Sequence, residues 1–390
     1  MLLKRELAGK VKQLSKKFPV VGILGPRQSG KTTLAQSVFP RYKYVNLEEL
    51  DIRRYAQEDP RRFIQSLLEE KGVILDEIQH VPDLLSYIQA QVDRKKKAGF
   101  FVVTGSQNIL LSHHINQTLA GRIAIVTLLP VTIEELKSHS LLPKKMETAL
   151  FKGFYPSIYA EKVVPVDWYS NYIRTYVERD VRQIKNVTDL TLFQKFLKLC
   201  AGRIGQLLNL TALGNDCGIN TNTARSWLSL LEASYIVFLV YPHHKNFSKR
   251  LVKMPKLYFY DTGIACHLLE LESPKDVEIH YLRGGLFESM MLSDLMKQRF
   301  NAGLQSNIYF WRDKSGNEID CILERKGQLI PIEMKSGATV NTSYFEGLAK
   351  WNLLARSTRP LGYVVYAGTG KQVREAGTAL GWEEASSLNL

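Results

Sequence analysis

Short apolar segments alternate with amphipathic stretches along the first third of the chain. Four apolar segments of four to six residues are predicted to be buried strands; they span residues 20–24, 72–75, 100–103 and 123–128. Helical patterns lie between them, one beginning at Lys31 and another ending near Ala120. This alternation predicts an α/β core.

The middle of the chain changes to a helical pattern. Apolar residues recur at helical spacing between residues 132 and 199, and the stretch 167–186 carries aromatic residues three and four positions apart. Two helices, a strand and a return strand are expected next, at residues 205–217, 219–234, 235–241 and 257–260. Helix, turn, helix and hairpin in this order predict a winged helix-turn-helix.

The last third begins with an amphipathic helix, expected at residues 281–300. Three short strands follow, at residues 308–312, 318–323 and 329–335. A turn of about six residues between the last two would let them pair as a hairpin. The whole chain is therefore expected to be an α/β protein of several domains.

Residues 25–32, GPRQSGKT, connect the first predicted strand to a helix. Strand, glycine loop and helix form the context of a Walker A phosphate-binding loop (P-loop), whose backbone N–H groups bind phosphate oxygens. Lys31 is expected at the β- and γ-phosphates of ATP and the Thr32 hydroxyl at Mg²⁺. The complete set of expected nucleotide-binding residues in this loop is Gly25, Pro26, Arg27, Gln28, Ser29, Gly30, Lys31, Thr32 and Thr33.

Two carboxylates end the second predicted strand. Asp76 is expected to hold Mg²⁺, and Glu77 is expected to orient and deprotonate the water that attacks the γ-phosphorus. The third strand ends in a polar segment in which Ser106 and Asn108 are both candidates for sensing the γ-phosphate. The pattern does not choose between these two.

Several arginines are candidates for sensing nucleotide. Arg122 precedes the last core strand, where AAA+ ATPases keep an arginine finger that acts on a neighbouring subunit. A surface arginine capping a helix is the alternative. Arg174, Arg179 and Arg182 lie on the middle helices, either as nucleotide sensors or on a solvated face.

Charge is distributed unevenly within a formal net charge of +14. Residues 1–150 hold 23 Lys and Arg against 15 Asp and Glu, residues 151–270 hold 15 against 9, and residues 271–390 hold 14 against 14. The basic loop, residues 245–256, lacks acidic residues and is expected to contact DNA phosphates through Lys245, Lys249, Arg250, Lys253 and Lys256. Winged helices also bind proteins, which leaves a protein partner open.

Acidic residues recur on the predicted C-terminal helix and strands. Strand alternation puts Glu318 and Asp320 on one face, and Glu333 and Lys335 on one face of the next strand. With Glu288 from the helix, Asp320 and Glu333 are expected to bind Mg²⁺, and Lys335 to position a water. This spacing is the PD-(D/E)XK nuclease pattern, although a solvated sheet face carries similar charges.

The order of motifs resembles one known family. GPRQSGKT, ILDEIQ, VVTGSQNILL, LAGR, YVERDV, KLYFYDTG, EID and IEMK are similar to those of predicted prokaryotic AAA+ superfamily ATPases that carry a winged helix and a PD-(D/E)XK nuclease-like domain. The resemblance implies an AAA+ core, a helical lid, a winged helix and a nuclease-like domain, at residues 1–131, 132–200, 201–262 and 263–390. It also implies ATP and Mg²⁺ as cofactors and a homo-oligomer as the assembly. The nucleotide residues are then Lys31, Thr32, Asp76 and Glu77. The nuclease-type residues are Glu288, Asp320, Glu333 and Lys335.

Three functions remain open from the sequence. They are an ATPase that acts on DNA, an ATP-driven switch that binds a protein partner, and an ATP-gated nuclease. No apolar run approaches the roughly 18 residues of a membrane span, and the charged N-terminus resembles no signal peptide. The four cysteines form no CxxC pair and are expected to be buried free thiols. A cytoplasmic protein is therefore expected.

Overall fold

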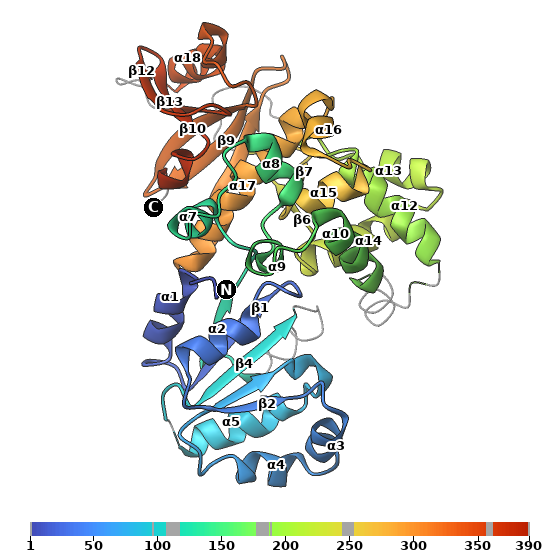
Figure 1. The fold of residues 1–390 in the computed structure, drawn as a ribbon, viewed down its shortest axis with the longest axis vertical. Coiled ribbons are helices and arrows are strands. Elements are labelled where there is room, and N and C mark those ends of the chain that lie inside the picture. The colour runs from blue at the N-terminus through green and yellow to red at the C-terminus, as the bar shows by residue number, and fades with distance from the viewer. Residues whose placement is uncertain are drawn as a thin grey trace.

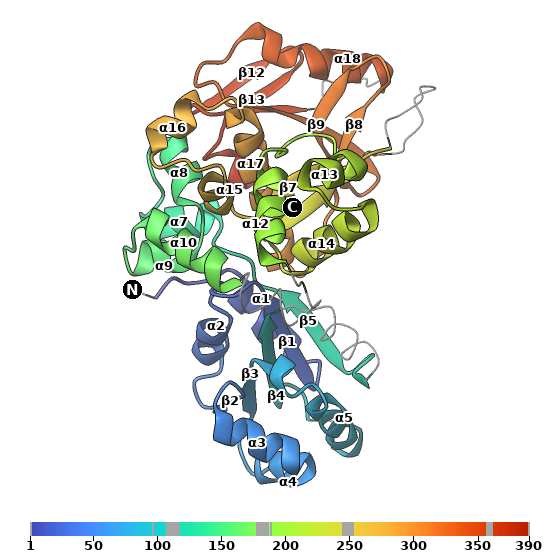
Figure 2. The ribbon, with the colours of Figure 1, turned by 90° about the vertical axis from the view of Figure 1, so that its right-hand side faces the viewer.

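The computed structural model describes residues 2–95, 97–106, 118–176, 187, 189–243, 253–355 and 362–388. A parallel sheet forms one end of the molecule, a mixed sheet the other, and helices lie between them (Figures 1 and 2). Six residues singled out in the sequence lie outside the described ranges: Asn108, Arg179, Arg182, Lys245, Lys249 and Arg250.

The N-terminal sheet has five parallel strands in the order β2-β3-β4-β1-β5. Their bounds are β1 Val20–Gly25, β2 Lys43–Asn46, β3 Val73–Asp76, β4 Phe101–Ser106 and β5 Ile123–Thr127. Four were predicted, whereas the edge strand β2 was not. Because all five run in parallel, the loops after β1, β3 and β4 meet at one edge of the sheet.

Helices cover both faces of this sheet. They are α1 Leu7–Leu14, α2 Lys31–Val38, α3 Leu50–Glu58, α4 Pro60–Ser66, α5 Leu84–Arg94 and the short 3₁₀ helix η1 Ile78–His80. Successive strand residues face opposite sides: Val102 packs in one core with Leu34 of α2, and Val103 in the other with Ile88 of α5. The P-loop edge is thereby fixed on a sheet buried on both faces.

The middle of the chain is helical, as predicted. Its helices are α7 Ile133–Ser138, α8 Met146–Lys152, α9 Pro156–Ala160, α10 Pro165–Thr175, α12 Leu190–Ala201, α13 Leu210–Cys217, α14 Thr221–Ala233, α15 Thr262–Leu268 and α16 Pro274–Ile279. Asn209 and Asn220 cap α13 and α14 through their side chains. An antiparallel hairpin of β6 (Val237–Val240) and β7 (Lys256–Phe259) follows α14. The expected helix, turn, helix and hairpin are present, and their assignment as a winged helix stays a prediction.

The C-terminal part consists of a long helix and a six-stranded sheet in the order β12-β13-β11-β10-β9-β8. Its elements are α17 Arg283–Asn301, β8 Ile308–Arg312, β9 Glu318–Arg325, β10 Gln328–Lys335, α18 Glu346–Leu354, β11 Tyr363–Tyr366, β12 Lys371–Arg374, β13 Gly377–Gly381 and the 3₁₀ helices η3 Thr342–Phe345 and η4 Ala385–Ser387. The predicted six-residue turn between β9 and β10 is wrong. Lys326 and Gly327 alone form it, with φ of 48° and 79°, the left-handed values of a tight hairpin turn.

One large hydrophobic core joins the middle of the chain to the C-terminal sheet. It includes Ile133, Phe193, Leu230, Met290 and Cys321. Helix α17 lies at its centre and contacts α1, α8, α15, β5, β7 and β10. All four cysteines are buried and free, as expected. Among the described helices, none is both long enough and apolar enough to cross a bilayer.

Candidate functional site

The P-loop runs from the end of β1 to the start of α2 as predicted. Gly25 passes so close to the end of β5 that a Cβ there would lie 2.0 Å from the Leu128 carbonyl oxygen. Gly30 has a φ of 91° and directly precedes α2. These two positions explain why the loop needs glycine at both ends.

Lys31 is buried and directed into the loop. Its ammonium donates a hydrogen bond to the Pro26 carbonyl at 2.8 Å, and the Ser29 hydroxyl donates to the same oxygen at 3.0 Å. A buried ammonium beside the first turn of a helix favours an anion at this point. The predicted phosphate role of Lys31 fits this geometry.

Asp76 lies at the end of β3, buried opposite the start of α2. The Thr32 hydroxyl donates to its two carboxylate oxygens at 3.0 and 2.8 Å. Two groups that the sequence did not single out also donate to it: Tyr44 of β2, at 2.8 Å, and Thr104 of β4. The pair predicted to hold Mg²⁺ is therefore preassembled by three neighbouring strands and a helix.

Glu77 follows Asp76 in a left-handed conformation, with a φ of 55°. Its N–H donates to the Thr104 hydroxyl at 3.2 Å, and the Gln79 amide donates to its carboxylate. The same amide donates to the Ser106 hydroxyl at 3.0 Å. Gln79 thus connects the predicted general base to one of the two predicted phosphate sensors.

The Glu77 carboxylate is held in its charged form. Burial alone would raise the pKa of Glu77, but Lys31, the Gln79 hydrogen bond and Arg27 together outweigh burial and lower this pKa. The strand tip therefore presents a deprotonated carboxylate beside the phosphate loop, as a general base requires.

A pocket of about 610 Å³ opens over the P-loop. Its lining residues come from the P-loop and α2, from Glu77, from the N-terminal segment and from α9 with the residue after it; they include Leu2, Lys4, Arg5, Pro156 and Glu161. This volume lies within the range of small-molecule sites. Helix α9, from the segment predicted to be a lid, therefore lines this pocket, and the assignment of that segment as a lid stays a prediction.

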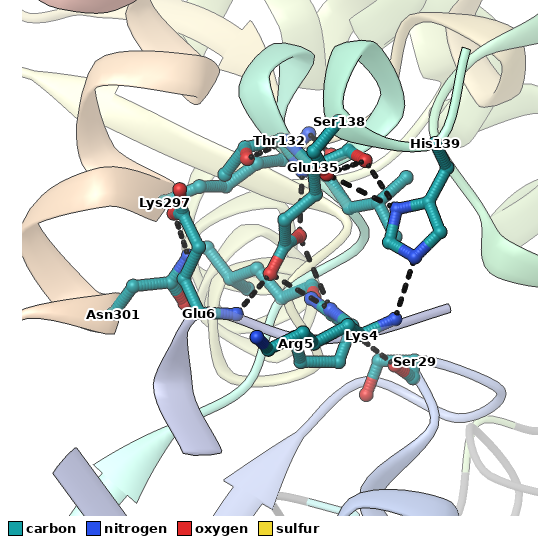
Figure 3. A network of polar contacts seen from close by, with 12 residues as sticks. Lys4, Arg5, Glu6, Ser29, Thr132, Glu135, Ser138, His139, Lys297 and Asn301 are labelled. Carbon is teal, nitrogen blue, oxygen red and sulfur yellow. Dashed lines mark hydrogen bonds and ion pairs between the residues drawn. The ribbon is translucent and has the colours of Figure 1, made fainter. Parts of the chain in front are cut away.

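Arg5 ties the P-loop to the middle of the chain (Figure 3). Its buried guanidinium donates to the carbonyls of Ser29 at 2.7 Å and Leu129 at 2.6 Å. It also donates to both carboxylate oxygens of Glu135, each at 3.1 Å. No motif marks Arg5, because its partners lie 24 to 130 positions away along the chain.

Glu135 connects this arginine to the start of α7. Its carboxylate accepts hydrogen bonds from the backbone N–H groups of Glu6 and Thr132, and the Thr132 hydroxyl completes a capping box. Glu6 in turn accepts a hydrogen bond from Asn301 at the end of α17. A continuous polar network thus runs from the P-loop to the central helix of the large core (Figure 3).

Arg122 lies at the N-terminal ends of the parallel strands, whereas the P-loop lies at their C-terminal ends. Its carbonyl accepts a hydrogen bond from the N–H of Val20, at the start of β1. The P-loop follows the other end of that strand, roughly 17 Å away at ~3.3 Å per residue. The Arg122 guanidinium pairs with Asp93 of α5 at 2.6 Å. Arg122 is therefore remote from the nucleotide pocket of its own chain, and its action on a neighbouring subunit stays a prediction.

The four predicted nuclease-type residues come together at α17, β9 and β10. Lys335 is 2.6 Å from Glu333 and 3.6 Å from Asp320, and the N–H of Met334 donates to Asp320 at 2.8 Å. Burial and Asp320 raise the pKa of Glu288 and that of Glu333. Burial opposes ionisation of Asp320, but Lys335 and Lys256 outweigh it and lower its pKa.

This cluster departs from the predicted metal site. Within the described ranges, no group of three or more His, Cys, Asp and Glu is arranged to hold a metal ion. Lys256, expected in the DNA-binding loop, lies instead at the start of β7, buried against Glu288 and Glu318. Its assignment to phosphate contact is therefore wrong, because its side chain points into the protein. The metal role of Glu288, Asp320 and Glu333 stays a prediction.

Three segments of the chain match protein-family models. Residues 17–137 match an AAA domain. Residues 143–275 and 283–384 match two domains of unknown function, DUF8612 and DUF4143. The first match contains the complete P-loop, Asp76 and Glu77.

Similar proteins occur in bacteria and archaea. An uncharacterized protein of Mycobacterium tuberculosis is 28% identical over 348 residues, which are 88% of this chain and 76% of that protein. One of Methanocaldococcus jannaschii is 23% identical over 337 residues, 77% of this chain and 71% of that protein. A solved structure, the Walker-type ATPase of Pyrococcus abyssi, is 14% identical, with 68% of this chain and 96% of that chain covered and a TM-score of 0.47. The AAA match and the P-loop geometry together identify residues 17–137 as an AAA-type P-loop ATPase domain.

Proposed function

We propose that this protein hydrolyses ATP with Mg²⁺ at the P-loop and couples hydrolysis to DNA. The observation that carries the hydrolytic part is the assembly of a buried lysine, a hydroxyl–carboxylate pair and a deprotonated glutamate at one edge of the sheet. Each of these groups corresponds to a requirement of phosphoryl transfer.

Each residue of the site has a separate role in binding or hydrolysis. Lys31 and the loop N–H groups bind the phosphates, and Glu77 accepts a proton from the attacking water. Thr32 and Asp76 fit Mg²⁺, because hydroxyl and carboxylate oxygens are its usual ligands and these two already contact each other. When bound, the ion would neutralise negative charge on the phosphates. Gln79 keeps Glu77 oriented, and Ser106 is within reach of the same amide.

Steady-state ATP turnover in Mg²⁺ tests the roles of Lys31 and Glu77. Lys31→Ala should abolish nucleotide binding, because the phosphates lose the buried ammonium that is expected to bind them. Glu77→Gln should keep nucleotide affinity and lose about 10²–10⁴-fold in kcat, the usual contribution of a general base. Glu58→Gln removes an exposed carboxylate at the end of α3 and should leave both quantities unchanged. Hydrolysis by Glu77→Gln at the wild-type rate would show that another group activates the water.

The proposed DNA contact rests on charge and on the surface around α14. Residues 151–270 carry a net charge of +6, from 15 basic and 9 acidic residues, and Lys253 is exposed beside the hairpin. The first turn of α14 presents uncharged donors around a surface depression, namely Asn220, Thr221, Asn222, Thr223 and Ser226. Such donors and nearby cations contact phosphates in helix-turn-helix proteins.

DNA binding as a function of salt separates this proposal from a protein-binding switch. Alanine at Lys249, Arg250 and Lys253 together should weaken binding to all sequences alike and lower the salt slope by about three units, one for each lost phosphate contact. The same charge change at exposed C-terminal lysines, Lys275, Lys314 and Lys350, is the matched control. Unchanged affinity of the first variant at low salt would favour a protein partner.

A further inference from the structure

Strand β7 of the hairpin directs two side chains at the C-terminal acidic cluster. Lys256 and Tyr258 are two residues apart and therefore share a face of the strand. The Lys256 ammonium is 3.7 Å from the Glu288 carboxylate, and the Tyr258 hydroxyl donates to the same carboxylate oxygen at 2.8 Å. Lys256 also forms an ion pair with Glu318 of β9. Both side chains are buried, with Lys256 4% exposed.

Every carboxylate of this cluster has a cationic partner within the chain. Glu288 pairs with Lys256, and Glu318 with Lys256 and with Arg312 at 3.0 Å. Asp320 and Glu333 pair with Lys335. Four carboxylates thus face three cationic groups, which leaves little negative charge for a divalent ion.

The space around the carboxylates is also occupied. Glu333 is 4% exposed, and a Cβ on Gly347 of α18 would lie only 2.1 Å from one of its carboxylate oxygens. The Lys256 ammonium lies between Glu288 of α17 and Glu318 of β9, so it occupies space beside one of the three carboxylates predicted to bind a metal ion. An ammonium and a divalent cation repel each other strongly at such distances where water is excluded.

We propose that Lys256 acts as a built-in counter-cation that fills the acidic cluster, so that a divalent cation and the docked hairpin exclude each other. The C-terminal cluster is then a junction that ties β7 to α17 and β9. Backbone hydrogen bonds beside it support the same docking: Phe310 of β8 donates to Tyr241 at 3.1 Å, and His243 donates to Phe310 at 2.7 Å. The inference does not depend on ATP hydrolysis, because none of these residues lines the nucleotide pocket.

Calorimetric titration of the full chain with Mn²⁺ alone tests this inference. The wild type should show no Mn²⁺ site that depends on Asp320 up to about 1 mM, so that wild type and Asp320→Asn give the same titration. Lys256→Met should gain an Mn²⁺ site with a Kd at least tenfold below that concentration. Adding Asp320→Asn to Lys256→Met should abolish the gained site. Lys275→Met, which removes an exposed charge outside the cluster, should behave as the wild type in this titration.

Two results would overturn the inference. One is an Asp320-dependent Mn²⁺ site in the wild type as tight as that of Lys256→Met. The other is a folded Lys256→Met protein, judged by circular dichroism and thermal melting, that gains no such site. If Lys256→Met does not fold, the titration is made on the double variant Lys256→Met with Glu318→Gln. This variant removes the cation together with one of its paired carboxylates. Absence of the Mn²⁺ site in the folded double variant would also overturn the inference.

Discussion

Asp76 accepts hydrogen bonds from hydroxyl groups on three different elements. Thr32 comes from α2, Tyr44 from β2 and Thr104 from β4. Thr104 has a second role, because its hydroxyl accepts the N–H of Glu77 and so fixes the left-handed backbone there. At the scale of single residues, Thr104 contacts both carboxylates on which the proposed hydrolysis depends.

Replacing Thr104 by valine should therefore lower kcat with little change in nucleotide affinity. Valine keeps the shape of the side chain but removes one hydrogen bond to a charged group, worth about 1.5–3 kcal/mol, or roughly 10–100-fold in rate if the misorientation affects only the transition state. Turnover and nucleotide binding are measured in parallel. Thr175→Val, an exposed change on α10, is the control, and a rise in KM with unchanged kcat would assign Thr104 to binding instead.

Sequence motifs predicted the groups at the P-loop but not those that hold them. Lys31, Thr32, Asp76 and Glu77 lie at fixed offsets from strand ends, so the pattern alone places them together. Tyr44, Thr104 and Arg5 reach the site from segments distant in the chain, and no local pattern reports such contacts. Lys256 was wrongly predicted to contact DNA, because the charge pattern of the sequence does not show that its side chain points towards Glu288 and Glu318.

Between elements, the Arg5–Glu135 pair joins the P-loop, the end of β5 and α7. Arg5→Met should lower the free energy of unfolding by about 3–5 kcal/mol, because Glu135 is left buried without its cation. It should also weaken nucleotide binding, since Ser29 loses the donor to its carbonyl. Thermal melting and nucleotide titration measure the two effects.

Controls for this prediction come from the same network. Lys4→Met removes the adjacent, exposed charge and should leave the free energy of unfolding nearly unchanged. Combining Arg5→Met with Glu135→Gln should recover part of the lost stability, since the unpaired charge is removed. Equal destabilisation by Lys4→Met and Arg5→Met would mean that the buried pair contributes nothing specific.

At the level of elements, the sequence predicted best where local periodicity is strong. The apolar strands β1, β3 and β4 are fully or largely buried in a parallel sheet, which gives continuous apolar runs. Strand β5 is only partly buried at the sheet edge, but its apolar run was still recognisable. Edge strands β2 and β12 were missed, because polar residues interrupt the apolar pattern within four residues. The interior strands β11 and β13 were not predicted. The tight turn at Lys326 and Gly327 was missed because lysine rarely adopts a left-handed conformation.

For the whole molecule, the position of Arg122 makes a prediction about assembly. An arginine at the sheet edge remote from its own P-loop can act on nucleotide only in another subunit. Arg122→Ala and Glu77→Gln should each be inactive alone, and mixing them should restore part of the turnover, because some interfaces then pair an intact Arg122 with an intact Glu77. Full activity of a strictly monomeric enzyme by sedimentation would contradict a finger acting between subunits.

The proposed coupling of ATP hydrolysis to DNA is tested most directly by one measurement. ATP turnover by the purified wild-type protein is compared in Mg²⁺ at low salt, with and without double-stranded DNA. The account predicts measurable turnover that depends on Glu77, changes on addition of DNA and loses this response as salt rises. Absence of turnover in both conditions would contradict hydrolysis at the P-loop, and an identical rate with and without DNA at low salt would contradict the coupling.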